Sequence, residues 1–188
     1  TCKIRLIGDK SLSKRDFSRV SEPLKKFGVK FFFKKEGKLP LSILGTSHPK
    51  GINYFENKGS AQCKSSIMFA ALNALGTTTI KAKKSRNHSE LLFKYLKIPI
   101  KVKNYDKYDF ITLQKPKKIK AFNYKIPGDI SSGAFFIVLT VLSNNSKLLI
   151  RNVNINPSRT GVIKILRKMG AKISFKNQRN YRGEKISD

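Results

Sequence analysis

The sequence KKFGVK at residues 25–30 recurs in altered form as KYLKIP at residues 94–99 and as RKMGAK at residues 167–172. Each copy is typical of a helix end, a stop and the start of a strand, because apolar residues at helical spacing come before it and strand-forming residues follow. Gly28 and Gly170 supply the stop in two copies. The chain is therefore predicted to use one helix–stop–strand junction three times.

An arginine stands shortly before each of these three helices. Arg15, Arg86 and Arg159 lie 71 and 73 residues apart. Further helices are expected after Gly59-Ser60 and after the segment GDIS at residues 128–131. The matched junctions, arginines and upstream helices indicate a repeat of about 70 residues with two helices and several strands. The fold class predicted from this alternation is α/β.

Hydrophobic periodicity predicts the remaining elements. The expected helices cover residues 17–27, where Pro23 weakens the pattern, 61–75, 91–95, 132–142 and 161–169. The expected strands cover residues 29–33, 77–80, 98–102, 110–113, 122–126, 148–151 and 171–175. The polar run at residues 177–188 completes no element in this interpretation. Because the chain starts at Thr1 and ends inside that run, we expect an internal piece of a longer protein.

The composition excludes several classes. No apolar stretch approaches the roughly 20 residues that cross a bilayer, so no membrane partner is expected. Two cysteines, Cys2 and Cys63, and two histidines, His48 and His88, are too few for a disulfide scaffold or a four-ligand zinc site. We expect a cytoplasmic protein without structural metal, in which Cys63 is a buried helix residue.

The chain is strongly basic. Its 188 residues include 40 Lys and Arg and 11 Asp and Glu, which gives a formal charge of +29. Such an excess suggests nucleic acid, because lysines on phosphates release counterions. The lysines are scattered, however, and no aromatic stacking motif of the RNA-binding kind occurs. A basic nucleic-acid-binding module and a solvated surface enriched in lysine by coding bias remain the two interpretations of this charge.

Several predicted helices begin with small or hydroxyl residues beside a basic group, at residues 60–64, 85–87 and 158–160. Free N–H groups and the positive end of the helix dipole suit such positions to anions. Ordinary capping is the alternative, since Ser, Thr and Asn are preferred caps. If the repeats pack with parallel helices, the helix ends converge on one surface that binds a multiply anionic small molecule.

Other polar residues give weaker signals. His88 with Glu90 fits neither a metal-binding helix motif nor a catalytic triad, and we interpret His88 as a satisfied or solvated side chain. Asp9 and Asp129 each follow a glycine and are interpreted as turn residues rather than catalytic acids.

Six motifs, in order along the chain, carry a resemblance to a known family. They are GDKSLSKR (8–15), LPL (39–41), SAQCKS (60–65), RNHSE (86–90), PGDISSGAF (127–135) and NPSRTG (156–161). They resemble the G-D-x-S-L-x-x-R, L-P, S-A-Q-x-K-S, R-x-H-x-E, P-G-D-x-S-S-x-A-F and N-P-T-R-x-G motifs of the 3-phosphoshikimate 1-carboxyvinyltransferase (EPSP synthase) family, class II branch. The resemblance covers essentially the whole chain and less than half of the family's length.

The resemblance implies a fold of repeated βαβαββ units in an inside-out α/β barrel, incomplete in this chain. Residues 1–125 would hold the last two units of the first cleft domain. Residues 126–188 would hold the truncated first unit of the second. The helices of such units point their N-termini into the cleft between the domains.

The resemblance also implies an activity: transfer of the carboxyvinyl group of phosphoenolpyruvate to the 5-hydroxyl of shikimate 3-phosphate, without cofactor or metal. Arg15 and Gln62 would bind phosphoenolpyruvate. Ser60, Ala61, Gln62 and Arg86 would bind shikimate 3-phosphate. The family's catalytic Asp, Glu and Lys match no position here, so this chain alone is expected to be inactive, while the full-length protein is expected to be a monomer.

The chain departs from the family pattern at two places. Asp16-Phe17 follow Arg15 where the family usually has Pro-Met, and the acid is expected to weaken the anion site. Ser158 replaces the usual Thr. Two further alternatives stay open: a UDP-sugar enolpyruvyl transferase, although its Cys-bearing loop is not seen and the SAQCK and RNHSE motifs favour shikimate, and a non-catalytic remnant that folds poorly.

Overall fold

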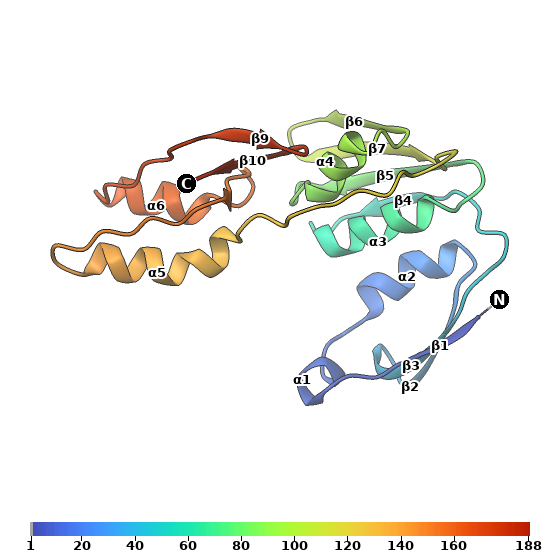
Figure 1. Ribbon diagram of the computed structural model, residues 1–188. Helices are drawn as coiled ribbons and strands as arrows, with labels where there is room; N and C mark the ends of the chain where they lie inside the picture. Colours follow the sequence, from blue (N-terminus) through green and yellow to red (C-terminus); the bar gives the residue numbers. More distant parts are fainter. Residues whose placement is uncertain (1) are drawn as a thin grey trace. The chain divides into compact units, whose positions relative to one another are not determined.

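The computed structural model describes residues 2–188 and divides into two compact units (Figure 1). The first unit comprises Thr1–Ser85 and Lys97–Ile119, and the second comprises Arg86–Leu96 and Lys120–Asp188. Among the described residues, no helix is long and apolar enough to cross a membrane.

The first unit begins with a three-stranded antiparallel sheet, drawn in blue in Figure 1. Its strands β1 (Lys3–Leu6), β2 (Lys30–Lys35) and β3 (Lys38–Leu44) take the order β1-β3-β2. Two helices, α1 (Lys10–Ser13) and α2 (Ser18–Lys26), connect β1 to β2 along the chain. Helix α2 confirms the predicted helix, with Pro23 inside it.

A four-stranded sheet completes the first unit. It contains β4 (Asn53–Glu56), β5 (Thr77–Lys83), β6 (Ile100–Asn104) and β7 (Tyr108–Gln114) in the order β4-β5-β7-β6. Strands β4 and β5 are parallel, and the other two pairs are antiparallel. Helix α3 (Ala61–Ala71) contacts β5 and β7, and its Ile67 and Met68 are buried together with Ile80, Ile111 and Leu113 of the strands. Since buried and more exposed residues alternate along β5 and β7, one face of the sheet joins the core and the other meets solvent.

The second unit holds the helices α4 (His88–Tyr95), α5 (Ile130–Leu142) and α6 (Gly161–Lys168). Its strands β8 (Val153–Asn154), β9 (Arg179–Tyr181) and β10 (Glu184–Ser187) form an antiparallel sheet in the order β8-β10-β9. A small core unites Ile130 of α5, Val153 of β8 and Ile163 of α6.

The internal repeat is visible in the strand orders. Three times the chain makes an antiparallel sheet edge whose spatial order is first, third, second: β1-β3-β2, β5-β7-β6 and β8-β10-β9. Elements β4, α3, β5, α4, β6 and β7 follow one another as one βαβαββ series. This confirms the α/β class predicted from the alternation and the βαβαββ unit implied by the family resemblance.

Some predicted elements are wrong. Residues 122–126, 148–151 and 171–175 are extended or irregular and form no strand, and α3 ends at Ala71 rather than at residue 75. In residues 122–126, ring contacts of Phe122 and Tyr124 and the hydrogen bond from Lys125 N to the Tyr181 hydroxyl (3.1 Å) replace pairing with another strand. Apolar residues alone therefore did not distinguish a paired strand from a packed extended segment.

The polar run at residues 177–188 was wrongly predicted to complete no element. It forms the β9–β10 hairpin, whose two central residues, Arg182 and Gly183, have φ of 48° and 91°. Two consecutive positive φ values are typical of the tight turns that match strand twist. Because Arg is less typical of the first turn position than Asn or Asp, the sequence did not indicate this hairpin.

Candidate functional site

Three of the residues predicted to bind substrate begin helix α3. Ser60 is the N-cap, and its Oγ accepts a hydrogen bond from the Cys63 backbone N–H at 3.2 Å. Ala61 and Gln62 form the first turn, where Gln62 is exposed, while Cys63 is buried as expected. The capping and anion-binding readings of Ser60 are compatible, because one cap leaves other N–H groups of the first turn directed outward.

Arg15 lies in the same unit, between α1 and α2, and is exposed. Asp9, interpreted from the sequence as a turn residue, caps α1 by accepting a hydrogen bond from Leu12 N at 2.7 Å. Asp16 accepts hydrogen bonds from Ser18 N (2.8 Å) and Ser18 Oγ (2.7 Å) at the start of α2. These bonds lower the pKa of Asp16 below its usual value. Within residues 2–188, Asp16 makes no ion pair with Arg15, so the acid serves the helix start rather than the neighbouring guanidinium.

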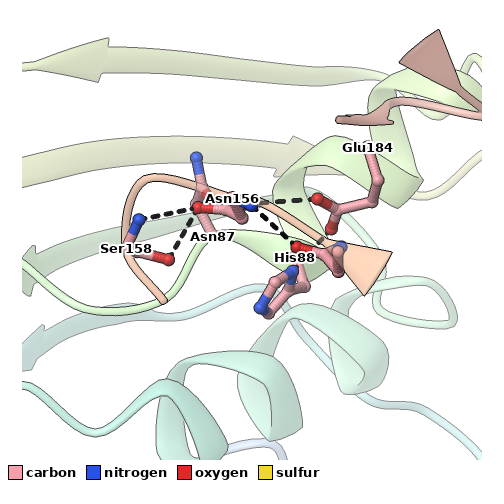
Figure 2. Close-up of polar contacts among 6 residues, drawn as sticks. Asn87, His88, Asn156, Ser158 and Glu184 are labelled. Atoms are coloured by element: carbon pink, nitrogen blue, oxygen red, sulfur yellow. Dashed lines mark hydrogen bonds and ion pairs between the residues drawn. The ribbon is translucent and has the colours of Figure 1, made fainter. Parts of the chain in front are cut away.

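The second unit places Arg86 shortly before α4, followed by a partly buried polar network (Figure 2). Asn156 Nδ2 donates a hydrogen bond to Asn87 Oδ1 at 2.8 Å and another to Glu184 Oε2 at 3.3 Å. His88 Nδ1 lies 2.5 Å from Glu184 Oε1. Hereafter we call Asn87, His88, Asn156 and Glu184 the α4 anchor network. His88 is therefore a satisfied side chain, one of the two readings that the sequence allowed.

Glu184 is the charged centre of the α4 anchor network and is 5% exposed. Burial by itself raises the pKa of a carboxyl group, but hydrogen bonds from His88, Asn154 and Asn156 outweigh it and hold the pKa of Glu184 below its usual value. The carboxylate is thus ionised at neutral pH. With an ionised acceptor, His88 Nδ1 carries the proton and donates it.

A cavity of about 580 Å³ opens beside this network within the second unit. Its wall includes Arg86, His88, Asp129, Arg159 and Glu184, together with aromatic side chains from the 122–126 segment. The Arg159 guanidinium donates to Asp129 Oδ1 at 2.6 Å and to Ser131 Oγ at 2.7 Å. Across the described part of the chain, Arg86 forms no ion pair, so its positive charge faces the cavity without a protein counterion.

The three arginines that recur in the repeat, Arg15, Arg86 and Arg159, therefore differ in their contacts. Arg159 serves the start of α5, where Asp129 is the N-cap and accepts a hydrogen bond from Ser131 N at 3.1 Å. Asp129, interpreted from the sequence as a turn residue, is thus a helix cap, and Ser131 and Ser132 donate hydrogen bonds to it. Hydrogen bonding to Arg159 is the main cause that lowers the pKa of Asp129. Arg15 and Arg86 remain available for anions.

The structure thus gathers Ser60, Ala61 and Gln62 at one helix start, with Arg15 elsewhere in the first unit and Arg86 in the second. Sequence reasoning assigned no role to Asn87, Asn156 or Glu184. The NPSRTG motif contains Asn156 and could have drawn attention to it, but no local pattern marks Glu184, which lies 96 residues after His88. In residues 2–188, no group of three or more His, Cys, Asp or Glu residues is arranged so that it could hold a metal ion.

Comparison with known proteins gives a consistent result. The family model for EPSP synthase (3-phosphoshikimate 1-carboxyvinyltransferase) matches residues 1–186. The 3-phosphoshikimate 1-carboxyvinyltransferases of Endomicrobium trichonymphae and Bacillus subtilis are 43% and 39% identical to this chain, over 97% and 96% of its length. A solved EPSP synthase from Acinetobacter baumannii superposes with a TM-score of 0.80 at 36% identity, over 98% of this chain. The chain spans 42% of the length of each of these relatives.

Proposed function

This chain belongs to the EPSP synthase family, and on that premise we propose that it contributes to the transfer of the carboxyvinyl group of phosphoenolpyruvate to the 5-hydroxyl of shikimate 3-phosphate. The products are 5-enolpyruvylshikimate 3-phosphate and phosphate, a step of the shikimate pathway to aromatic amino acids. The observation that carries the proposal is the unbroken family match over residues 1–186, which includes every motif quoted above.

The proposal assigns binding residues to each substrate, and Gln62 contacts both. Arg15 and Gln62 bind phosphoenolpyruvate, and Ser60, Ala61, Gln62 and Arg86 bind shikimate 3-phosphate. The exposed guanidiniums of Arg15 and Arg86 support this, because a planar fork of N–H donors matches carboxylate and phosphate oxygens. The position of Ser60, Ala61 and Gln62 at the start of α3 adds backbone donors and the positive end of the helix dipole.

The domain assignment is part of the same proposal. Residues 1–125 belong to the first cleft domain and residues 126–188 to the second. This boundary follows the repeat units of the family, whereas the compact units of the structure group Arg86–Leu96 and residues 120–125 with the later residues. The protein is a cytoplasmic monomer that acts on small anions and takes no nucleic acid, metal or cofactor. Since the chain spans 42% of its relatives, we expect the 188 residues alone not to turn over substrate.

The experiment is a phosphate-release assay on protein expressed from the complete reading frame that encodes these residues. Release is expected only when phosphoenolpyruvate and shikimate 3-phosphate are both present. The 188-residue chain, assayed in parallel, is expected to release none. Release with a UDP-sugar acceptor in place of shikimate 3-phosphate, or none with either acceptor, would overturn the proposal.

A further inference from the structure

Asn87 and His88, the two residues that follow Arg86, both form hydrogen bonds with side chains from distant parts of the second unit. Asn156 stands in the loop between β8 and α6 and holds the Asn87 side chain. Glu184 begins β10 and holds the His88 ring. Arg86 itself contacts neither anchor through any recorded hydrogen bond or ion pair in residues 2–188. The anchors thus act on its backbone neighbours (Figure 2).

The orientation of the Asn156 amide is fully determined by its neighbours. Its Oδ1 accepts hydrogen bonds from Ser158 N at 2.9 Å and from Ser158 Oγ at 2.7 Å. The amide nitrogen must then face Asn87 and Glu184, which are both acceptors. Asn156 is 4% exposed, so a wrong donor pattern here would leave buried groups unpaired. The Thr usual in the family at position 158 offers the same hydroxyl, which explains why Ser158 is a mild departure.

The β9–β10 hairpin packs closely against helix α4 at Gly183. A Cβ added to Gly183 would lie 2.9 Å from the Leu91 carbonyl oxygen, so only glycine fits beside this helix. Strand β10 and helix α4 are in contact, and Glu184 follows Gly183 directly. The close contact at Gly183 therefore fixes the position of α4 against the hairpin, while the α4 anchor network fixes the side chains of Asn87 and His88.

We propose that Asn156 and Glu184 are positioning residues for Arg86. They hold the Asn87–His88 segment in one orientation, so that the Arg86 guanidinium is presented to an anion in the adjoining cavity. This inference rests on the proposed function, in which that anion is the phosphate of shikimate 3-phosphate. A buried polar network with matched donors and acceptors specifies orientation where apolar packing would permit sliding.

The test uses the protein from the complete reading frame and compares Glu184→Gln and Asn156→Asp with the parent. Glu184→Gln replaces one carboxylate acceptor by an amide donor, whereas Asn156→Asp replaces the donor to both Asn87 and Glu184 by an acceptor. Both changes conserve side-chain shape. We expect the KM for shikimate 3-phosphate to rise about tenfold, with kcat and the KM for phosphoenolpyruvate changed less than about twofold. Glu22→Gln, which alters an exposed Glu22–Lys25 pair on α2, is the matched control and should change nothing.

A double-mutant cycle separates positioning from simple stability. In an Arg86→Gln background, Glu184→Gln should add less than about twofold to the KM for shikimate 3-phosphate, because the group being positioned is gone. Equal losses in both backgrounds would overturn the inference. If the buried variants fail to fold, Asn87→Ala removes the acceptor from a half-buried position and is expected to show the same selective effect.

The two proposals fail differently. If Arg86→Gln leaves the KM for shikimate 3-phosphate unchanged while phosphate release needs both substrates, the role of Arg86 is wrong and the positioning inference falls with it. If Arg86→Gln raises that KM but neither Glu184→Gln nor Asn156→Asp does, the proposed function stands and only the positioning inference is rejected.

Discussion

Lys97 adopts, after helix α4, the left-handed backbone conformation that Gly28 adopts after helix α2, with φ of 56° and 95°. Gly170 does the same after α6, with φ of 94°. All three residues stand fourth in the junctions KKFGVK, KYLKIP and RKMGAK. The repeat has therefore preserved the backbone turn even where a side chain makes it costly, because each helix must stop to let the next strand begin.

Replacing Lys97 by Gly should stabilise the protein. The left-handed conformation costs a non-glycine residue about 1–2 kcal/mol, and the extra entropy of unfolded glycine returns part of it, so we expect a gain of up to about 1 kcal/mol. Lys97 is exposed, so no packing is lost. Urea unfolding measures the change. Lys94→Gly, a neighbouring exposed lysine inside α4, should instead cost about 1 kcal/mol, and a loss at both positions would refute the strain argument.

Stability should depend on pH through Glu184. Its folded-state pKa lies below the usual value of 4.5, so the carboxylate stabilises the fold above that value and the contribution disappears as pH falls through the folded pKa. The difference in unfolding free energy between the parent and Glu184→Gln should therefore be large at pH 7 and shrink below about pH 4.5. Urea midpoints measured from pH 7 to pH 3 check this. A difference that stays constant across the range would show that the charge of Glu184 is not what stabilises.

Helix α5 exposes a row of large apolar side chains. Phe135, Phe136, Leu139 and Leu142 are 80%, 63%, 64% and 78% exposed. Contiguous apolar surface of this kind promotes association, so we expect the 188-residue chain to associate as its concentration rises. Light scattering after size-exclusion chromatography measures it. Phe135→Lys with Leu142→Lys should suppress association, whereas Leu75→Lys, at an isolated exposed position, should not. If Leu75→Lys also suppressed association, the associating surface would not be the apolar row on α5.

The basic charge is gathered partly on the outer face of the four-stranded sheet. Lys81 and Lys83 of β5 and Lys101 and Lys103 of β6 are exposed there, and Lys81 Nζ lies 4.9 Å from the centre of the Tyr108 ring. We expect single-stranded RNA to bind weakly, with a Kd above about 1 μM near 150 mM salt and a steep salt dependence. Fluorescence anisotropy with a random RNA 20-mer measures this Kd and its salt dependence. Tight binding that is lost when these four lysines become Gln would favour the nucleic-acid module instead.

Much of the fold followed from local patterns. The helix around Phe17–Phe27, the stops at Gly28 and Gly170 and the repeat of two helices with several strands are encoded by spacing and turn residues that act over a few positions. The βαβαββ order itself was implied by the family resemblance. The strands at residues 122–126, 148–151 and 171–175 were wrong because pairing depends on a partner that apolar spacing does not reveal. Periodicity missed helix α1 and strands β1, β4, β8, β9 and β10 because their patterns are short or polar, and it missed strand β3, which contains Pro40.

The candidate site shows the same division. Ser60, Gln62 and Arg86 stand in contiguous motifs, so the sequence pointed to them. The α4 anchor network depends on contacts between residues 69 and 96 positions apart, which no local pattern carries. Even His88, which lies inside a motif, gave no hint that its partner would be Glu184.

The KM for shikimate 3-phosphate, measured by phosphate release on the protein from the complete reading frame, shows whether Arg86 binds the phosphate of this substrate. Arg86→Gln removes the guanidinium that faces the cavity without a protein counterion, and we expect the KM to rise at least tenfold, since a charge-assisted hydrogen bond is worth about 1.5–3 kcal/mol. Arg5→Gln, at an exposed position on β1, should leave it unchanged. Equal KM values for the parent and Arg86→Gln would mean that Arg86 does not bind this phosphate.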